Sequence, residues 1–128
     1  MRSTKSQIPN PKQFSNSNFQ KTSPRLAVIL SDSCCAPRRL GVTAFSLAVS
    51  GLDPHSSQKG KLDLFGKPLR ITTEAVADQL ATAANFLMGN AAESIPAVII
   101  RNHGLTLSEF EGWVPGVSQE EDLFSGIL

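Results

Sequence analysis

The chain has 128 residues, a length that suits one domain with a core of its own. Its 12 Lys and Arg residues nearly balance its 11 Asp and Glu residues, so charge gives no case for a nucleic-acid partner or an anionic membrane surface. No apolar run approaches the roughly 20 residues that a membrane span needs, and no secretory signal is recognisable near Met1.

Cys34 and Cys35 are the two cysteines, and they are neighbours in the sequence. Adjacent Cα atoms lie about 3.8 Å apart, which is less than the roughly 4.4–6.8 Å that a disulfide usually spans. We therefore expect reduced thiols and a reducing, cytoplasmic location. The pair has no Cys or His partner at ligand spacing, so it does not predict a zinc site.

Residues 1–25 are rich in Ser, Asn, Gln, Lys and Pro. Such a composition buries too little apolar surface to become ordered alone. We predict a disordered or loosely packed arm over residues 1–25 and a folded unit over residues 26–128.

Four apolar segments predict strands. Residues 26–30 form a continuous apolar run, which is typical of a strand buried on both faces. Residues 42–49 predict a second strand, residues 69–72 a short third and residues 95–100 a fourth. The sequence therefore favours an α+β fold, with a mixed sheet and one main helix.

That helix is predicted over residues 74–88. Its apolar positions recur at three- and four-residue steps, as on one helix face: Val76, Leu80, Ala83, Ala84, Leu87 and Met88. Thr72 or Thr73 is the expected N-cap, and Gly89 is the expected left-handed residue after the last turn. Residues after 101 are predicted to form loops, with a short helix or strand over residues 120–128.

Ser31, Asp32 and Ser33 directly follow the first predicted strand. Ligands bind at the carboxyl ends of strands in open sheets, and hard oxygen ligands suit Mg²⁺ or Mn²⁺. The alternative is a plain turn, because these residue types favour turns. The residues alone favour the turn.

Basic and glycine-containing segments supply a second, weaker signal. Arg38 and Arg39 offer planar guanidinium groups that match phosphate or carboxylate. A basic stretch over residues 59–70 is suited to surrounding a polyanion, although a solvated loop explains it equally. Gly89 and Asn90 are placed to present backbone groups to a nucleotide, and a plain helix C-cap explains the glycine equally well.

Six segments in order resemble the coenzyme F-420:L-glutamate ligase (gamma-glutamyl ligase) family. They read LAVILSDSCCAPRRLG, VTAFSLAVSGLDP, KGKLDLFGKPLRIT, AVADQLATAANFLMGNA, IPAVIIR and EEDLFSGIL. The resemblance covers residues 26–128 and implies the C-terminal half of such an enzyme, with a partial version of that family's α+β fold.

The resemblance implies a GTP-dependent amide-forming reaction. A carboxylate of the deazaflavin coenzyme precursor becomes an acyl phosphate, and the amino group of L-glutamate then attacks it. Mg²⁺ or Mn²⁺ is implied, with K⁺ as a further candidate, because cations must neutralise two anionic reactants. The family also implies a homo-oligomer.

Ten positions fall on the family's site motifs. The implied metal ligands are Asp32, Ser33 and Asn90. The implied nucleotide or substrate contacts are Arg38, Arg39, Thr43, Asp63, Gly66, Met88 and Gly89. No catalytic residue is assigned.

Three hypotheses remain open at this point. The chain is a ligase half that works only with an N-terminal half, which in the family supplies another metal carboxylate and much of the nucleotide site. Alternatively, it is a non-catalytic fragment or paralogue that serves as a binding or dimerisation module. A third possibility is a related ligase that joins an amino acid to another acid.

Overall fold

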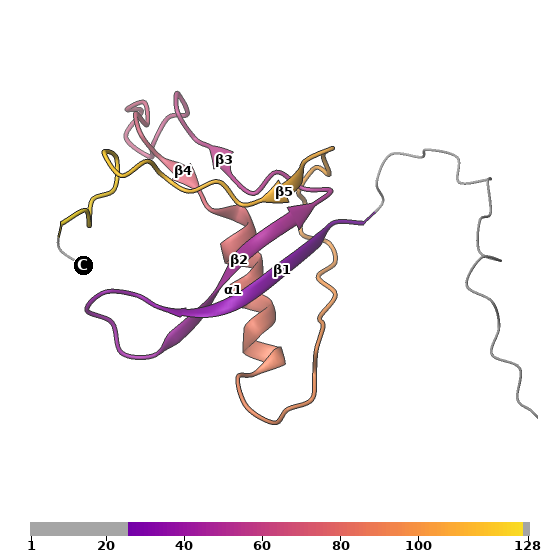
Figure 1. Cartoon of the computed structure of the whole chain (residues 1–128). Helices are drawn as coiled ribbons and strands as arrows, with labels where there is room; N and C mark the ends of the chain where they lie inside the picture. The colour runs from indigo at the N-terminus through magenta and orange to yellow at the C-terminus, as the bar shows by residue number, and fades with distance from the viewer. Residues whose placement is uncertain (1–25, 127–128) are drawn as a thin grey trace, which may run out of the picture.

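The computed structural model describes residues 26–126 (Figure 1). A three-stranded antiparallel sheet in the order β1–β2–β5 packs against one helix, and β3 pairs with β4 in a separate antiparallel ladder. The elements are β1 Val28–Cys35, β2 Val42–Ser50, β3 Ser56–Ser57, β4 Thr73–Glu74, α1 Val76–Met88 and β5 Glu111–Trp113. The predicted α+β class with one main helix is confirmed, but every strand pair in the described residues is antiparallel, so the sheet is not mixed as predicted. The arm predicted over residues 1–25 lies outside the described residues.

Strands β1 and β2 form a long hairpin whose pairing is irregular at one point. Leu30 pairs with Ala48, but the next residue, Ser31, pairs with Ser46, so Leu47 is an extra residue in β2. Such a bulge bends a strand and frees backbone groups from the ladder. The two predicted strands are confirmed, although β1 runs on through residues 31–35, where a turn was favoured.

The two faces of this hairpin have different surroundings. Ile29 packs against the core cluster on the α1 side, and Val49 is a buried member of that cluster. Val28 and Leu30 face the opposite side and are more than half exposed, at 59% and 56%. The prediction of a first strand buried on both faces is therefore wrong, because no described element covers this second face of the sheet.

Helix α1 begins two residues later than predicted, because Thr73 and Glu74 belong to β4. Ala75 is the N-cap residue and makes no side-chain capping bond, so the predicted threonine cap is wrong. The packed face also differs from the predicted one. Its buried residues are Val76, Ala77 and Ala81, whereas the predicted Ala83 and Leu87 are exposed.

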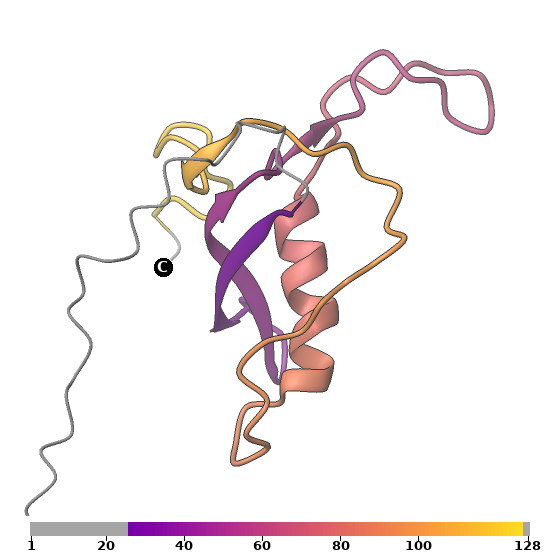
Figure 2. The same cartoon turned by 90° about the vertical axis from the view of Figure 1, so that its right-hand side faces the viewer.

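The segment between β3 and β4, residues 58–72, projects from the body as an irregular hairpin (Figure 2). Backbone bonds cross it from Gly60 N–H to Leu69 C=O and from Leu69 N–H to Lys61 C=O, both at 2.8–2.9 Å. Residues 69–72 form no strand, which corrects the prediction, since only Leu62 and Pro68 form an isolated bridge here.

Residues 95–100, predicted as a strand, also have no strand assignment in the described structure. A strand is defined by a pairing partner, and this segment runs alongside α1 without one (Figure 2). Strand β5, whose Trp113 pairs with Ala48, is not among the predicted strands. Residues 119–126 form turns, so the predicted final helix or strand is absent up to residue 126.

Candidate functional site

Asp32 and Ser33 lie inside β1 and not beyond its end. Asp32 pairs with Phe45, and Ser33 pairs with Ala44. Because side chains alternate along a strand, Asp32 lies on the same face as Leu30, and Ser33 lies on the α1 face with Ile29. The carboxylate of Asp32 accepts a hydrogen bond from the Ser33 N–H at 2.7 Å, close to the free edge of β1.

The basic residues and Thr43 belong to the far end of the same hairpin. Arg39 donates its N–H to the Ala36 carbonyl at 3.2 Å, and Arg38 has a left-handed φ of 59°. Both arginines are exposed on this turn. Thr43 lies opposite Cys34, with 3.9 Å between its hydroxyl and the thiol, on the face that carries Asp32. Cys34 and Cys35 are free thiols, as predicted.

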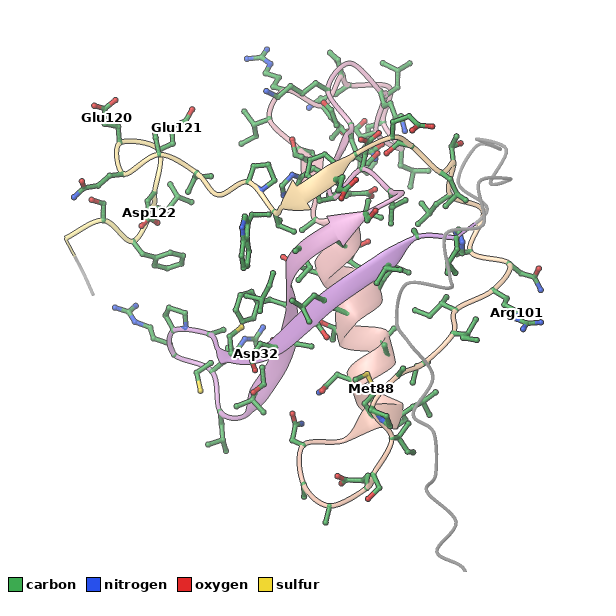
Figure 3. All side chains as sticks on the ribbon, turned by 45° about the vertical axis from the view of Figure 1, so that its right-hand side comes forward. Asp32, Met88, Arg101, Glu120, Glu121 and Asp122 are labelled. Carbon is green, nitrogen blue, oxygen red and sulfur yellow. The ribbon has the colours of Figure 1, made fainter. Side chains whose placement is uncertain are left out.

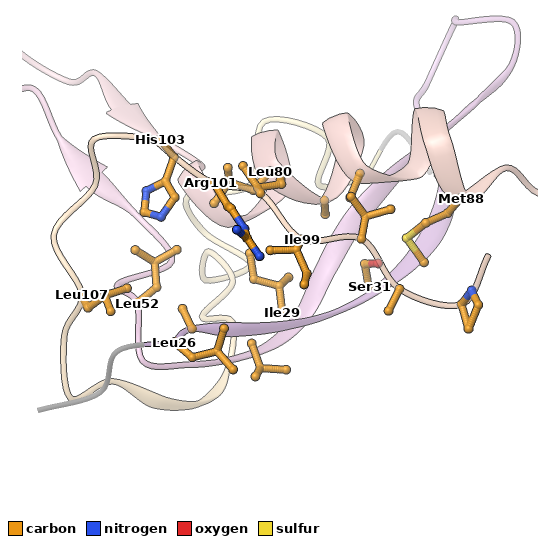
Figure 4. Close-up of a pocket in the computed structure, with 18 residues that line it drawn as sticks. Leu26, Ile29, Ser31, Leu52, Leu80, Met88, Ile99, Arg101, His103 and Leu107 are labelled. Carbon is orange, nitrogen blue, oxygen red and sulfur yellow. The ribbon is translucent and has the colours of Figure 1, made fainter. Parts of the chain in front are cut away.

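Met88, Gly89 and Asn90 form the end of α1 and the turn after it. Met88 lines a cavity of about 680 Å³ together with Ser31 of β1 (Figure 4). Gly89 has a φ of 73°, and its N–H bonds the Asn85 carbonyl at 2.8 Å, so it ends the helix as predicted. Figure 3 shows Asp32 on the hairpin and Met88 at the end of α1.

Glu93 completes this turn and was not predicted to belong to the site. Its carboxylate accepts a hydrogen bond from the Ala91 N–H at 2.7 Å. It also lies against Gly89, where an added Cβ would come within 2.2 Å of the Glu93 Cδ atom. A larger residue at position 89 would therefore displace the Glu93 carboxylate from this place. The available sequence signal was an acidic residue four positions after the helix-ending glycine.

Asp63 and Gly66 are not brought to the other candidate residues. One Asp63 carboxylate oxygen accepts the Phe65 and Lys67 N–H groups, each at 2.8 Å, and Gly66 has a φ of 77°. This carboxylate closes its own turn at the tip of the projecting hairpin. The tip and the C-terminal end of α1 lie at opposite ends of the molecule (Figures 1 and 2).

Two polar side chains of α1 fix the helix on β2, and the sequence analysis gave neither a role. The Asp78 carboxylate accepts the Ser46 N–H at 2.8 Å and the Ser46 hydroxyl at 2.5 Å. One helical turn later, the Thr82 hydroxyl donates to the Ala44 carbonyl at 2.8 Å. Ser46 pairs with Ser31 of β1, and Ala44 pairs with Ser33. These bonds therefore fix where α1 lies along the β1–β2 hairpin, next to the site residues of β1.

The three implied metal ligands are of types that suit a hard cation, but the structure does not bring them together, because Asp32 and Ser33 lie on opposite faces of β1. Asp32, Ser33 and Asn90 would supply a carboxylate, a hydroxyl and an amide oxygen, the ligand types of Mg²⁺ and Mn²⁺. The set is small, and the described residues contain no group of three or more His, Cys, Asp or Glu placed to hold a metal. In the same range, no helix is long and apolar enough to cross a membrane.

Comparison with known proteins finds a family whose match includes both β1 and the turn after α1. The family model described as F420-0:Gamma-glutamyl ligase matches residues 12–102. The chain is 42% identical over 103 residues to the coenzyme F420:L-glutamate ligase of Methanocaldococcus jannaschii, covering 80% of this chain and 41% of that protein. The corresponding ligase of Methanothermobacter thermautotrophicus is 41% identical over 109 residues, or 84% of this chain and 43% of the relative.

A third relative, the coenzyme F420:L-glutamate ligase of Archaeoglobus fulgidus, is 38% identical over 112 residues, which are 86% of this chain and 44% of that protein. The chain thus spans less than half the length of the curated relatives it matches. The family match extends from before β1 to the residue after Arg101 and so includes the strand that carries Asp32 and the turn that carries Asn90. The chain belongs to the F420-0:gamma-glutamyl ligase family.

Proposed function

We propose that this chain takes part in attaching L-glutamate to a deazaflavin coenzyme F420 precursor. The observation that carries the proposal is the family match, which runs through both site segments, β1 and the turn after α1. Relatives named coenzyme F420:L-glutamate ligase are 41–42% identical to this chain over 80–84% of its length. The substrates proposed are accordingly the coenzyme precursor and L-glutamate.

The proposed reaction uses GTP to activate the precursor. A carboxylate oxygen of the precursor attacks the γ-phosphorus of GTP, GDP leaves, and an acyl phosphate forms. The glutamate nitrogen then attacks the acyl carbon, phosphate leaves, and the nitrogen loses a proton to give the amide. A divalent cation with Asp32 as a carboxylate ligand would neutralise charge between the anionic reactants.

The other candidate residues would bind and orient anionic groups. Arg38 and Arg39 are exposed on the β1–β2 turn, where guanidinium groups can reach phosphate or carboxylate oxygens. Thr43, at the start of β2, offers a hydroxyl on the face that carries Asp32. The Met88–Gly89 turn would contribute backbone groups to the nucleotide.

A calorimetric titration of Mn²⁺ with GTP tests this assignment on the native chain and the Asp32→Ala variant. We expect a measurable heat from the native chain and an affinity roughly tenfold or more weaker in the variant, because a hard anionic ligand is lost. Asp122→Ala, in the C-terminal turns, is the matched control and should bind like the native chain. Equal heats from native chain and Asp32→Ala would remove Asp32 from the site.

A second candidate function is a non-catalytic binding or dimerisation module, and the exposed apolar surface of the sheet supports it. Leu30 and Trp113 are 56% and 74% exposed there. A product assay by mass spectrometry, with GTP, L-glutamate and the precursor, separates the two when the chain is produced together with the part of the M. jannaschii relative outside the matched stretch, because a ligase half is expected to work only with its other half. Product formation favours the ligase, and an alternative acid that is glutamylated faster than the precursor would favour a related ligase.

A further inference from the structure

The outer edge of β1 is free, and a cavity lies beside it. β1 is a terminal strand of the sheet, because its one described partner is β2. The cavity of about 680 Å³ is bounded by β1 residues including Ile29 and Ser31, by Leu80 and Ala84 of α1, and by residues 96–101 (Figure 4). A free edge presents unpaired backbone N–H and C=O groups, which form a template for another strand.

Residues 95–101 form the far wall of this cavity and have the composition of a buried strand. They read IPAVIIR, and apolar residues on both faces are typical of a strand inside a sheet. Within the described part of the chain, they make no backbone hydrogen bond to another segment. Ile99 is 71% exposed although it lines the cavity. Residues 95–101 and the outer edge of β1 therefore both have backbone groups without a strand partner in the described part of the chain.

We infer that an extended apolar segment binds between the β1 edge and residues 96–101. This segment would come from the portion of the family fold that lies outside the stretch matched here. Neighbouring strands lie about 4.8 Å apart, so one inserted strand would hydrogen-bond to β1 and fill space that faces α1. Main-chain bonds would supply affinity, and alternate side chains would contact Leu80, Ala84 and Met88.

The coverage of the relatives supports this choice of occupant. More than half of each of the M. jannaschii and M. thermautotrophicus relatives lies outside the matched stretch, at 41% and 43% coverage. A second copy of β1 fits less well. Only the first part of the strand is apolar, VIL, and SDSCC follows, so a second copy would bring polar side chains to a cavity whose walls are mainly apolar. The inference rests on family membership and goes beyond the proposed catalysis.

Co-expression tests the inference. The full 128-residue chain, carrying an affinity tag, is produced together with the part of the M. jannaschii relative that lies outside the matched stretch. Ile99→Asp places a carboxylate in the apolar cavity, and we expect it to reduce recovery of the second polypeptide roughly tenfold or more, because burying an unpaired charge is costly. Ile71→Asp is the matched control, since Ile71 is 86% exposed on the projecting hairpin.

Hydrogen exchange on the recovered complex locates the contact. The inference predicts slower exchange for amides of residues 28–33 and 96–101 than in the chain alone, whether or not the complex is active. Three outcomes would overturn it: no recovery with the native chain, equal recovery with Ile99→Asp and Ile71→Asp, or protection confined to the opposite face around Trp113. Protection of β1 in the chain alone, together with a dimer mass, would assign the edge to a second copy instead.

Discussion

Asp78 of α1 and Ser46 of β2 are joined by two hydrogen bonds to one carboxylate oxygen, from the serine N–H at 2.8 Å and from its hydroxyl at 2.5 Å. Ser46 lies next to the irregular point of β2, where Leu47 is an extra residue. A strand irregularity and a helix side chain, 32 residues apart, therefore form one structural unit that holds α1 on the sheet.

Replacing Asp78 by Ala should lower the free energy of unfolding by about 1–3 kcal/mol, because the Ser46 N–H and hydroxyl lose their acceptor in a partly buried place. Asp78→Asn keeps an acceptor oxygen and should cost less. Urea denaturation followed by circular dichroism measures both. Gln79→Ala, on the exposed side of the same helix, should change stability little, and an equal loss in Gln79→Ala would contradict this role for Asp78.

Thr82→Val tests the neighbouring bond with almost no change of shape. The Thr82 hydroxyl donates to the Ala44 carbonyl at 2.8 Å, and its loss should cost about 1 kcal/mol. Thr82→Ser keeps the hydroxyl and should retain most of that stability. If valine were as stable as threonine, the bond would contribute nothing to the packing of α1.

These two bonds show why the helix was predictable but its packed face was not. The apolar spacing of Val76, Leu80 and Ala84 locates α1 correctly. Asp78 and Thr82 bond to β2 only because Ser46 and Ala44 present matching partners, which lie 32 and 38 residues earlier in the chain. A local pattern contains no information about such partners, so periodicity alone favoured Ala83 and Leu87.

The strand predictions differ in outcome for a similar reason. A short turn joins β1 to residues 42–49, so the two segments lie next to each other and pair as strands. Residues 95–100 are more apolar than β5, yet β5 is the segment that pairs, through Gly112 opposite Val49 and Trp113 opposite Ala48. Pairing depends on what lies nearby in the fold. The residue types of the candidate site could likewise be recognised in the sequence. Their positions could not, because Asp32 and Ser33 lie on opposite faces of β1 only if the strand continues past Leu30.

Exposed apolar residues on the sheet face opposite α1 predict self-association. Leu30 and Trp113, with Val28 and Ala48, line a hollow of about 310 Å³ there, and contiguous apolar surfaces of this kind mark interaction sites. Analytical ultracentrifugation should show a mass that increases with protein concentration. Leu30→Lys should weaken the association, whereas Leu40→Lys, on the hairpin turn, should not. A native chain that stays monomeric at high concentration would contradict the prediction.

Gly89→Ala should disturb the turn that follows α1, for two separable reasons. Gly89 has φ 73° and ψ −175°, a conformation that costs other residues about 1–3 kcal/mol. An added Cβ would also come within 2.2–2.6 Å of the Glu93 carboxyl group, which must then move and release the Ala91 N–H. We expect lower stability in urea and faster amide exchange at Ala91.

Gly104→Ala separates the two causes, because Gly104 has a similar φ of 71° but open space where a Cβ would lie. It should therefore show backbone strain alone. Adding Glu93→Ala to Gly89→Ala removes the carboxylate that the new methyl group meets, so the double variant should recover the part of the loss that this contact causes. If Glu93→Ala brings no recovery, the cost at Gly89 comes from its backbone conformation, and Glu93 does not shape this turn.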